Sequence, residues 1–98
     1  MPAVCRGDSV DSDVAHCSGM NRDQRSDNVK VNGTGISREG DHNTGHLVPP
    51  NIPPCASHTA PIVSGSSTVK INGKGCGRVG DATCTTVNSG SSNVFAGP

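Results

Sequence analysis

The residues of this chain that could do chemistry are its histidines and cysteines. Four histidines and five cysteines occur among the 98 residues: His16, His42, His46, His58, Cys5, Cys17, Cys55, Cys76 and Cys84. Imidazole nitrogen and thiolate sulfur are ligands that zinc prefers in proteins. An odd number of cysteines cannot pair completely within one chain, and the first residues lack the basic and apolar stretches of a secretory signal. Reduced thiols are therefore expected, and such thiols could bind a metal.

The apolar composition explains why a metal would matter. Leu, Ile, Val and Phe supply 17 of the 98 residues, and Phe95 is the single aromatic residue. That share lies below the roughly 20% typical of ordered domains, yet the formal net charge of +0 lacks the excess charge of disordered chains. Such a chain folds when a disulfide, a metal or a partner adds stability. Zero net charge without Trp or Tyr also argues against nucleic-acid binding, and no apolar run is long enough to span a membrane.

A repeat of forty residues must position these side chains. Residues 28–41 return as residues 68–81, with eight of fourteen positions identical. Residues 3–8 read like the second half of such a unit, and residues 90–96 read like its first half. The order half, whole, whole, half indicates three related units, the third assembled from the two ends. We therefore predict a single domain over residues 1–98 with pseudo-threefold symmetry.

Each whole unit has the pattern of a β-hairpin. Val29-Lys30-Val31 and Val69-Lys70-Ile71 alternate apolar and polar residues, so the branched side chains face one side and lysine faces water. Asn-Gly follows each segment, and a type I′ turn needs the positive φ angles that these two residues tolerate. The abundance of Gly and Pro leaves no helical periodicity, which predicts an all-β fold. Residues 9–27 and 42–64 are expected to be linkers.

The repeat also orders the candidate metal ligands. A histidine or cysteine follows the Gly-Asp pair of each unit: His16 after Asp8, His46 or His42 after Asp41, and Cys84 after Asp81. His58 lies shortly before the next hairpin and could supply a fourth ligand. Three imidazoles and one thiolate make a closed tetrahedral zinc site, whose binding energy would add to folding. The alternative is that histidines in polar loops are merely solvated.

The other histidine and cysteines have competing interpretations. His42 adjoins Asp41 and is expected to point outward. Cys76 occupies the position equivalent to Ile36, which indicates a small buried side chain, and Cys5 could be a buried thiol as well. Two cysteines could replace a predicted ligand: Cys17, which adjoins His16, and Cys55, which precedes His58 by three residues.

The repeat resembles a known family. Residues 65–81 carry the pattern Gly-Ser-Ser-x-Val-x-Ile-Asn-Gly-Lys-x-x-x-Arg-x-Gly-Asp, which is similar to the PAAR repeat. The resemblance covers most of the chain: residues 2–8, 26–41, 65–84 and 90–96. The Pro-Ala-Ala-Arg motif itself is degenerate, as in Pro2-Ala3-Val4-Cys5-Arg6. The likeness is greatest to the short spike-tip proteins of contractile-tailed bacteriophages, whose longer relatives cap type VI secretion spikes.

The resemblance implies a small cone with threefold pseudo-symmetry, whose long loops converge on a metal near the point. The metal would be zinc, with iron possible, and the implied ligands are His16, His46, His58 and Cys84. The base of the cone would sit on the end of a trimeric β-helical spike, with one monomer per trimer. Apolar residues are candidates for that contact: Val29, Val69, Ile71 and Val94.

The implied role is structural. The protein would be made in the host cytoplasm and would sit at the baseplate of the virion, on the tip of the tail spike. It would sharpen the spike for piercing the target cell envelope, with transient contact with the outer membrane and no stable insertion. No nucleic-acid partner is implied.

Two other functions would use the same residues: a zinc enzyme and a small binding module. A catalytic zinc site keeps an open coordination position and a nearby general base. Here four ligands would fill the shell, and Glu39 is the single glutamate of the chain, so no enzymatic activity and no catalytic residue are expected. A small metal-stapled or disulfide-bonded binding module is the alternative function.

Overall fold

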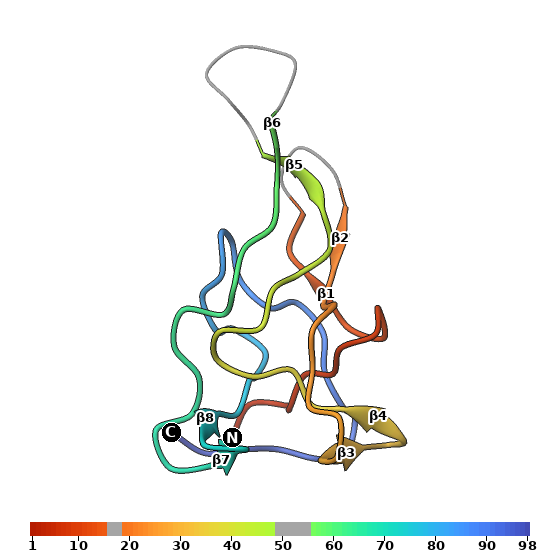
Figure 1. The fold of residues 1–98 in the computed structure, drawn as a ribbon. Coiled ribbons are helices and arrows are strands. Elements are labelled where there is room, and N and C mark those ends of the chain that lie inside the picture. Colours follow the sequence, from red (N-terminus) through yellow and green to blue (C-terminus); the bar gives the residue numbers. More distant parts are fainter. Residues whose placement is uncertain (16–18, 49–55) are drawn as a thin grey trace.

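The regular structure of this protein consists of short β-strands. The computed structural model describes residues 1–15, 19–48 and 56–98, and of residues 46–48 and 56–57 it describes the backbone alone. Within these ranges no helix occurs, and the strands form two-stranded antiparallel sheets (Figure 1). No helix that could cross a membrane is found in the described residues. The all-β prediction is confirmed.

The strands pair in sequence order, each with its neighbour along the chain. Their bounds are β1 Ser12–Asp13, β2 Met20–Asn21, β3 Lys30–Val31, β4 Thr34–Gly35, β5 His46–Val48, β6 Ala56–His58, β7 Lys70–Ile71 and β8 Lys74–Gly75. The hairpins β3–β4 and β7–β8 lie at one end of the molecule, and β5–β6 lies toward the other (Figure 1). The principal extents are 40 × 23 × 23 Å, so the molecule is elongated along this direction.

The two hairpins predicted from the repeat form as expected. In both turns the central residues have positive φ angles: 53° at Asn32 and 82° at Gly33, then 54° at Asn72 and 82° at Gly73. This geometry is that of a type I′ turn, whose twist matches the flanking strands. The lysines of β3 and β7 are exposed, whereas the branched residues that follow them are 8% exposed.

A third strand pair of the same kind comes from the two ends of the chain. Phe95 pairs with Ala3, as Lys30 pairs with Gly35 and Lys70 with Gly75. The Ala96 amide donates to the Pro2 carbonyl at 3.0 Å. Both ends of the chain lie beside β7 and β8 (Figure 1). Residues 94–96 therefore take the position that residues 29–31 and 69–71 take in the whole units.

The main hydrophobic core lies among these three strand pairs. It takes one residue from each first strand and one from each returning strand: Val31, Ile71 and Ala96, then Ile36, Cys76 and Val4. A second, smaller cluster joins Cys5, Ile62 and Val87. Burial of these few residues is supplemented by many polar contacts, as the low apolar content requires.

The linkers contain more regular structure than their sequence indicated. Strands β1 and β2 lie within residues 9–27, and β5 and β6 lie within residues 42–64. Side-chain hydrogen bonds hold the linkers at positions next to these strands. Asn43, for example, accepts from the Ala60 amide at 2.8 Å and donates to Asp13 at 2.9 Å.

Candidate functional site

Three backbone segments meet in a closed ring of hydrogen bonds. Cys5 donates to Gly77 at 3.0 Å, Gly77 to Ser37 at 3.0 Å, and Ser37 to Cys5 at 3.1 Å, all between main-chain atoms. A Cβ atom on Gly77 would lie 2.4 Å from the Ser37 carbonyl oxygen and 2.7 Å from Cys5 Sγ. Only glycine therefore fits this position of the ring. The ring marks an axis around which further contacts repeat.

An arginine–aspartate pair closes each unit beside this ring. The three pairs are Arg6–Asp11, Arg38–Asp41 and Arg78–Asp81. In each, the arginine amide donates to Oδ2 at 2.8 Å, and the guanidinium grips both carboxylate oxygens. The bidentate hydrogen bonds with aspartate raise the pKa of each arginine above its ordinary value. These charge-assisted contacts hold the corners in one geometry.

The third corner differs from the sequence interpretation. Asp8 was aligned with Asp41 and Asp81, but Asp11 makes the equivalent contact, and Asp8 accepts from Arg25 Nε at 3.0 Å instead. The loop between Arg6 and Asp11 holds two additional residues, and Asp8 and Ser9 adopt positive φ angles of 52° and 62°. The Gly-Asp pair at residues 7–8 is therefore not the unit's corner.

This correction changes the spacing of the candidate ligands. His16 follows Asp11 by five residues, the same interval that separates His46 from Asp41. Counted from Asp8 instead, His16 would follow by eight residues, which does not match the interval between Asp41 and His46. The two histidines are therefore equally spaced in the sequence from the corner aspartates of their units.

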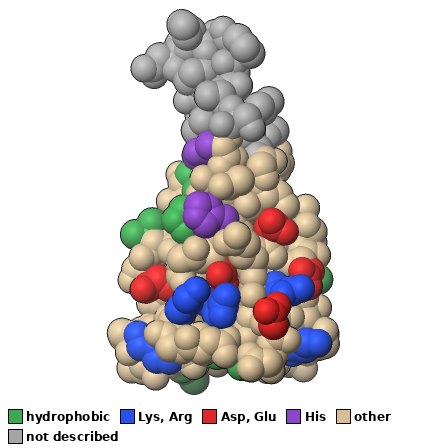
Figure 2. Space-filling model, viewed as in Figure 1, with side chains coloured by type: hydrophobic (Ala, Val, Ile, Leu, Met, Phe, Trp, Pro, Cys, Tyr) green, Lys and Arg blue, Asp and Glu red, His purple; other side chains and the backbone are tan. Residues whose placement is uncertain are grey.

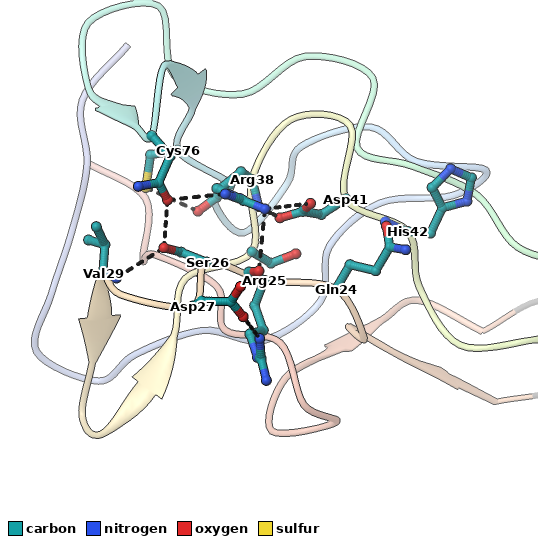
Figure 3. A network of polar contacts seen from close by, with 12 residues as sticks. Gln24, Arg25, Ser26, Asp27, Val29, Arg38, Asp41, His42 and Cys76 are labelled. Atoms are coloured by element: carbon teal, nitrogen blue, oxygen red, sulfur yellow. Dashed lines mark hydrogen bonds and ion pairs between the residues drawn. The ribbon is translucent and has the colours of Figure 1, made fainter.

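A buried serine lies four residues before the first paired residue of each unit. The side chains of Ser26, Ser66 and Ser91 are at most 2% exposed. Each hydroxyl accepts from the amides two and three residues ahead, at 2.9–3.3 Å. This local turn satisfies amides that no strand pairs with. Figure 3 shows one copy, in which Ser26 contacts Val29 close to the Arg38–Asp41 pair.

Arginines also link each unit to the next one. Arg6 Nη1 donates to Asn32 Oδ1 at 3.3 Å, and Arg38 Nη1 donates to Asn72 Oδ1 at 3.1 Å. At the third junction, Arg78 Nη1 donates to the Gly97 carbonyl at 2.7 Å. A backbone oxygen of the chain end thus takes the place of an asparagine side chain. The three links run in one direction around the axis.

A buried ion pair lies next to the ring. Arg22 Nη1 contacts Asp13 Oδ2 at 2.8 Å, and both side chains are fully enclosed. Arg22 Nε donates to Ser37 Oγ at 3.2 Å, which attaches the pair to the ring. Sequence reasoning missed both residues, because they lie in a polar linker without periodicity. The charge on each would be costly without the other.

Two potential metal ligands, Cys84 and Asp13, lie at or near the Arg22–Asp13 pair. Cys84 Sγ lies 3.9 Å from Met20 Sδ and 3.9 Å from Asn43 Nδ2, and Asn43 itself donates to Asp13. Asp13 Oδ1 is buried and has no hydrogen-bond partner among the described residues. A thiol and a carboxylate oxygen of this kind suit a cation in their vicinity.

The structure brings two of the predicted histidine ligands together in the backbone. His46 and His58 are directly opposite in the β5–β6 pair, and His58 Nε2 is buried. His16 lies outside the described residues, as do the alternative ligands Cys17 and Cys55. The side chain of His46 is not described either, so the predicted ligand set as a whole is not tested. Among described side chains, no group of three potential ligands is close enough to hold a metal.

His42 takes a different role. Its ring Nδ1 lies 2.9 Å from Thr59 Oγ1, and its amide donates to Gln24 Oε1 at 2.8 Å. The side chain is half-buried, and its ring points away from the Arg38–Asp41 pair (Figure 3). These contacts tie the linker to the unit rather than directing the imidazole toward the predicted ligands.

Two thiols behave as core side chains. Cys76 is 1% exposed in the main cluster, and Cys5 is 0% exposed in the second cluster, and neither is in a disulfide. Burial raises the pKa of the Cys76 thiol to about 11 and raises that of Cys5 as well. Both are therefore protonated at neutral pH and contribute packing, as predicted.

Comparisons with known proteins leave the resemblance as it stood. No protein-family model matches the chain, and no curated protein matches it. The likeness to PAAR repeats remains a prediction. Its support comes from the residues and contacts of this chain.

Proposed function

We propose that this protein is a PAAR-like cap that occupies the end of a trimeric β-helical spike and sharpens it for piercing. The observation that carries the proposal is the set of contacts repeated three times around the Cys5–Ser37–Gly77 ring. One chain can cover a threefold end face when it presents three similar surfaces to it. The unpaired strand edges at the end of such a spike would otherwise be open to unwanted pairing.

The base of the cap would be the end that carries β3, β4, β7 and β8. Three equivalent valines, Val29, Val69 and Val94, lie there, and their carbonyls accept equivalent backbone bonds at 2.9–3.0 Å. Val69 is 36% exposed, and the other two are partly buried against the core. Ile71, also predicted for the contact, is 8% exposed and belongs to the core. Ile71 is therefore the least accessible of the four apolar residues predicted for the contact.

The opposite end would carry the metal, and the whole chain would form a single cone-shaped domain. The proposed ligands are His16, His46, His58 and Cys84. The opposition of His46 and His58 and the equal spacing of His16 and His46 support this set. Zinc, or iron in its place, would tie loops from different units together when bound. A closed shell of four ligands leaves no position for a substrate, so the proposed role is structural and not enzymatic.

A binding experiment tests the proposal. The trimeric β-helical spike protein encoded in the same genome is purified and mixed with this protein. Mass measurement of the complex should give one chain per trimer, and cryo-electron microscopy should place it on the end of the spike in the virion. A spike that binds no chain, or that binds three chains along its sides, would contradict the proposal.

The second candidate is a small binding module without a spike. A disulfide-bonded form of it is disfavoured because Cys5 and Cys76 lie in separate core clusters as buried thiols. A binding module stabilised by a metal would bind zinc equally well, so metal content does not distinguish such a module from a spike cap. The stoichiometry with the trimer does.

A further inference from the structure

Three outward-facing positions at the base of the molecule are equivalent, but their residues differ. Lys30 pairs with Gly35 and Lys70 with Gly75, and Phe95 pairs with Ala3 in the same register. The next residue of each strand is buried in the core: Val31, Ile71 and Ala96. Lys30 and Lys70 are exposed, and Phe95 is 51% exposed. The three units thus present lysine, lysine and phenylalanine at one position.

The lysines carry charge that no ion pair neutralises in the part of the chain that the structure describes. All five arginines of the protein form ion pairs with aspartates. Among the described residues no ion pair involves Lys30, Lys70 or Lys74, which are the only lysines in the sequence. Basic side chains gather toward the broad end of the molecule (Figure 2). The base therefore carries exposed lysines that no described ion pair neutralises.

From this arrangement we infer that the base docks on an acidic end face, where each of three identical partner sites combines a carboxylate with a shallow apolar surface. This inference rests on the proposed function, because it assumes a threefold partner. Such a partner offers the same site three times, so one site must accept lysine and phenylalanine alike. Lysine has a four-carbon stem that covers apolar surface and an ammonium group that reaches a carboxylate. Phenylalanine fills the same apolar surface with its ring and leaves the carboxylate to solvent.

Phe95 is the position at which the proposed partner site can be tested most directly. Because the partner sites are identical, Phe95→Lys should bind the spike at least as tightly as the wild type. Phe95→Ala should weaken binding about tenfold, since an exposed aromatic anchor is lost. Phe95→Glu should weaken it further, because a second carboxylate would face the partner's own. A purely apolar site would instead reject lysine as strongly as glutamate.

The lysines are tested in parallel. Lys30→Gln combined with Lys70→Gln should weaken binding about tenfold at low salt and flatten its dependence on ionic strength. Lys30→Arg combined with Lys70→Arg keeps the charge and should retain binding. Val63→Ala is the matched control, because Val63 is 65% exposed and its amide bonds to Ala82, outside the three strand pairs.

The probe is the purified trimeric β-helical spike from the same genome, with Kd measured in 20 mM and 300 mM salt. All substituted side chains are exposed, so unchanged thermal unfolding confirms that each variant folds. Wild-type binding with equal losses for Phe95→Lys and Phe95→Glu overturns the acidic partner site and leaves the cap function intact. If the wild type binds and the Lys30→Gln, Lys70→Gln double variant binds with the same Kd, the acidic partner site is overturned as well. Absence of wild-type binding removes the cap function, and this inference with it.

Discussion

Arg22 and Asp13 form an ion pair in which both side chains are completely enclosed, with Nη1 and Oδ2 2.8 Å apart. The pair lies directly on the ring where the three units meet, through the bond from Arg22 to Ser37. A protein with so few large apolar residues therefore uses charge at its centre. This is costly unless each group keeps its partners.

Removing one member of this pair should unfold much of the protein. Asp13→Ala leaves the Arg22 guanidinium buried without its counter-charge, and we expect a loss of about 3–5 kcal/mol in the free energy of unfolding. Denaturant titration measures it. The control is Asp27→Ala, which removes a carboxylate that is 91% exposed and also pairs with an arginine. It should cost less than about 1 kcal/mol. Equal losses in the two variants would show that burial does not set the cost.

The hydrogen-bonded ring leads to a prediction about Gly77. Gly77→Ala would place Cβ 2.4 Å from the Ser37 carbonyl oxygen, so the ring must open. We expect the midpoint of thermal unfolding to fall by at least several degrees, since overpacking costs about 1–3 kcal/mol. Gly45→Ala is the matched control, because no atom lies within 4 Å of its added carbon. A Gly77→Ala protein as stable as Gly45→Ala would argue against a tight ring.

Ser66 and Ser67 are adjacent, so substituting each of them shows whether the hydrogen bonds of Ser66 stabilise the fold. Ser66 accepts from two amides and donates to the chain end, whereas Ser67 is exposed. Ser66→Ala should lower the free energy of unfolding by about 1–3 kcal/mol, because the Val69 amide loses its acceptor and the buried Gly97 carbonyl loses its donor. Ser67→Ala should change it by less than about 0.5 kcal/mol. Chemical denaturation of the two variants under identical conditions gives the comparison.

Metal content tests the proposed ligand set. Elemental analysis of the native protein should find one zinc or iron per chain, and the ratio of the two identifies the metal. His46→Ala and Cys84→Ala should lose the metal together with stability. His42→Ala should keep it, because that ring bonds to Thr59 instead. A folded wild-type protein without bound metal would contradict the proposed metal site.

Alkaline pH should destabilise the protein through Cys76. The pKa of this thiol is raised by burial from 9.0 to about 11 in the folded state. The folded state therefore retains a proton that the unfolded chain loses above about pH 9, and stability falls as pH rises toward 11. Cys76→Ala should show a shallower decline between these values in denaturant titrations. An identical slope would assign the decline to other groups, the more deeply buried Cys5 first.

Some of this architecture is visible in the sequence, because local chemistry specifies it. The Asn-Gly turns at residues 32–33 and 72–73 need positive φ angles, and the alternating segments before them set which side faces the core. The likeness between residues 90–96 and residues 65–71 indicated that the chain ends form a third unit. Cys76 as a core side chain followed from its equivalence to Ile36. All of these depend on neighbours a few residues away or on direct comparison of two segments.

Other features depended on contacts between distant residues. The corner aspartate of the third unit is Asp11 rather than Asp8, because two residues with positive φ lengthen that loop, and nothing in their types announces it. The strands within the linkers have no periodic apolar signal. The buried Arg22–Asp13 pair has none either, because the position of Arg22 depends on its contacts with Ser37 and Asp41.

The sequence by itself determined the all-β class and the two repeat hairpins, and it predicted which residues would hold a metal. The tertiary structure alone decided that Cys5, Ser37 and Gly77 close a ring, and that Lys30, Lys70 and Phe95 share one position around it. The physical reason is that a turn or a strand is stabilised by adjacent residues, whereas a closed ring exists only when segments about thirty to seventy residues apart have come together.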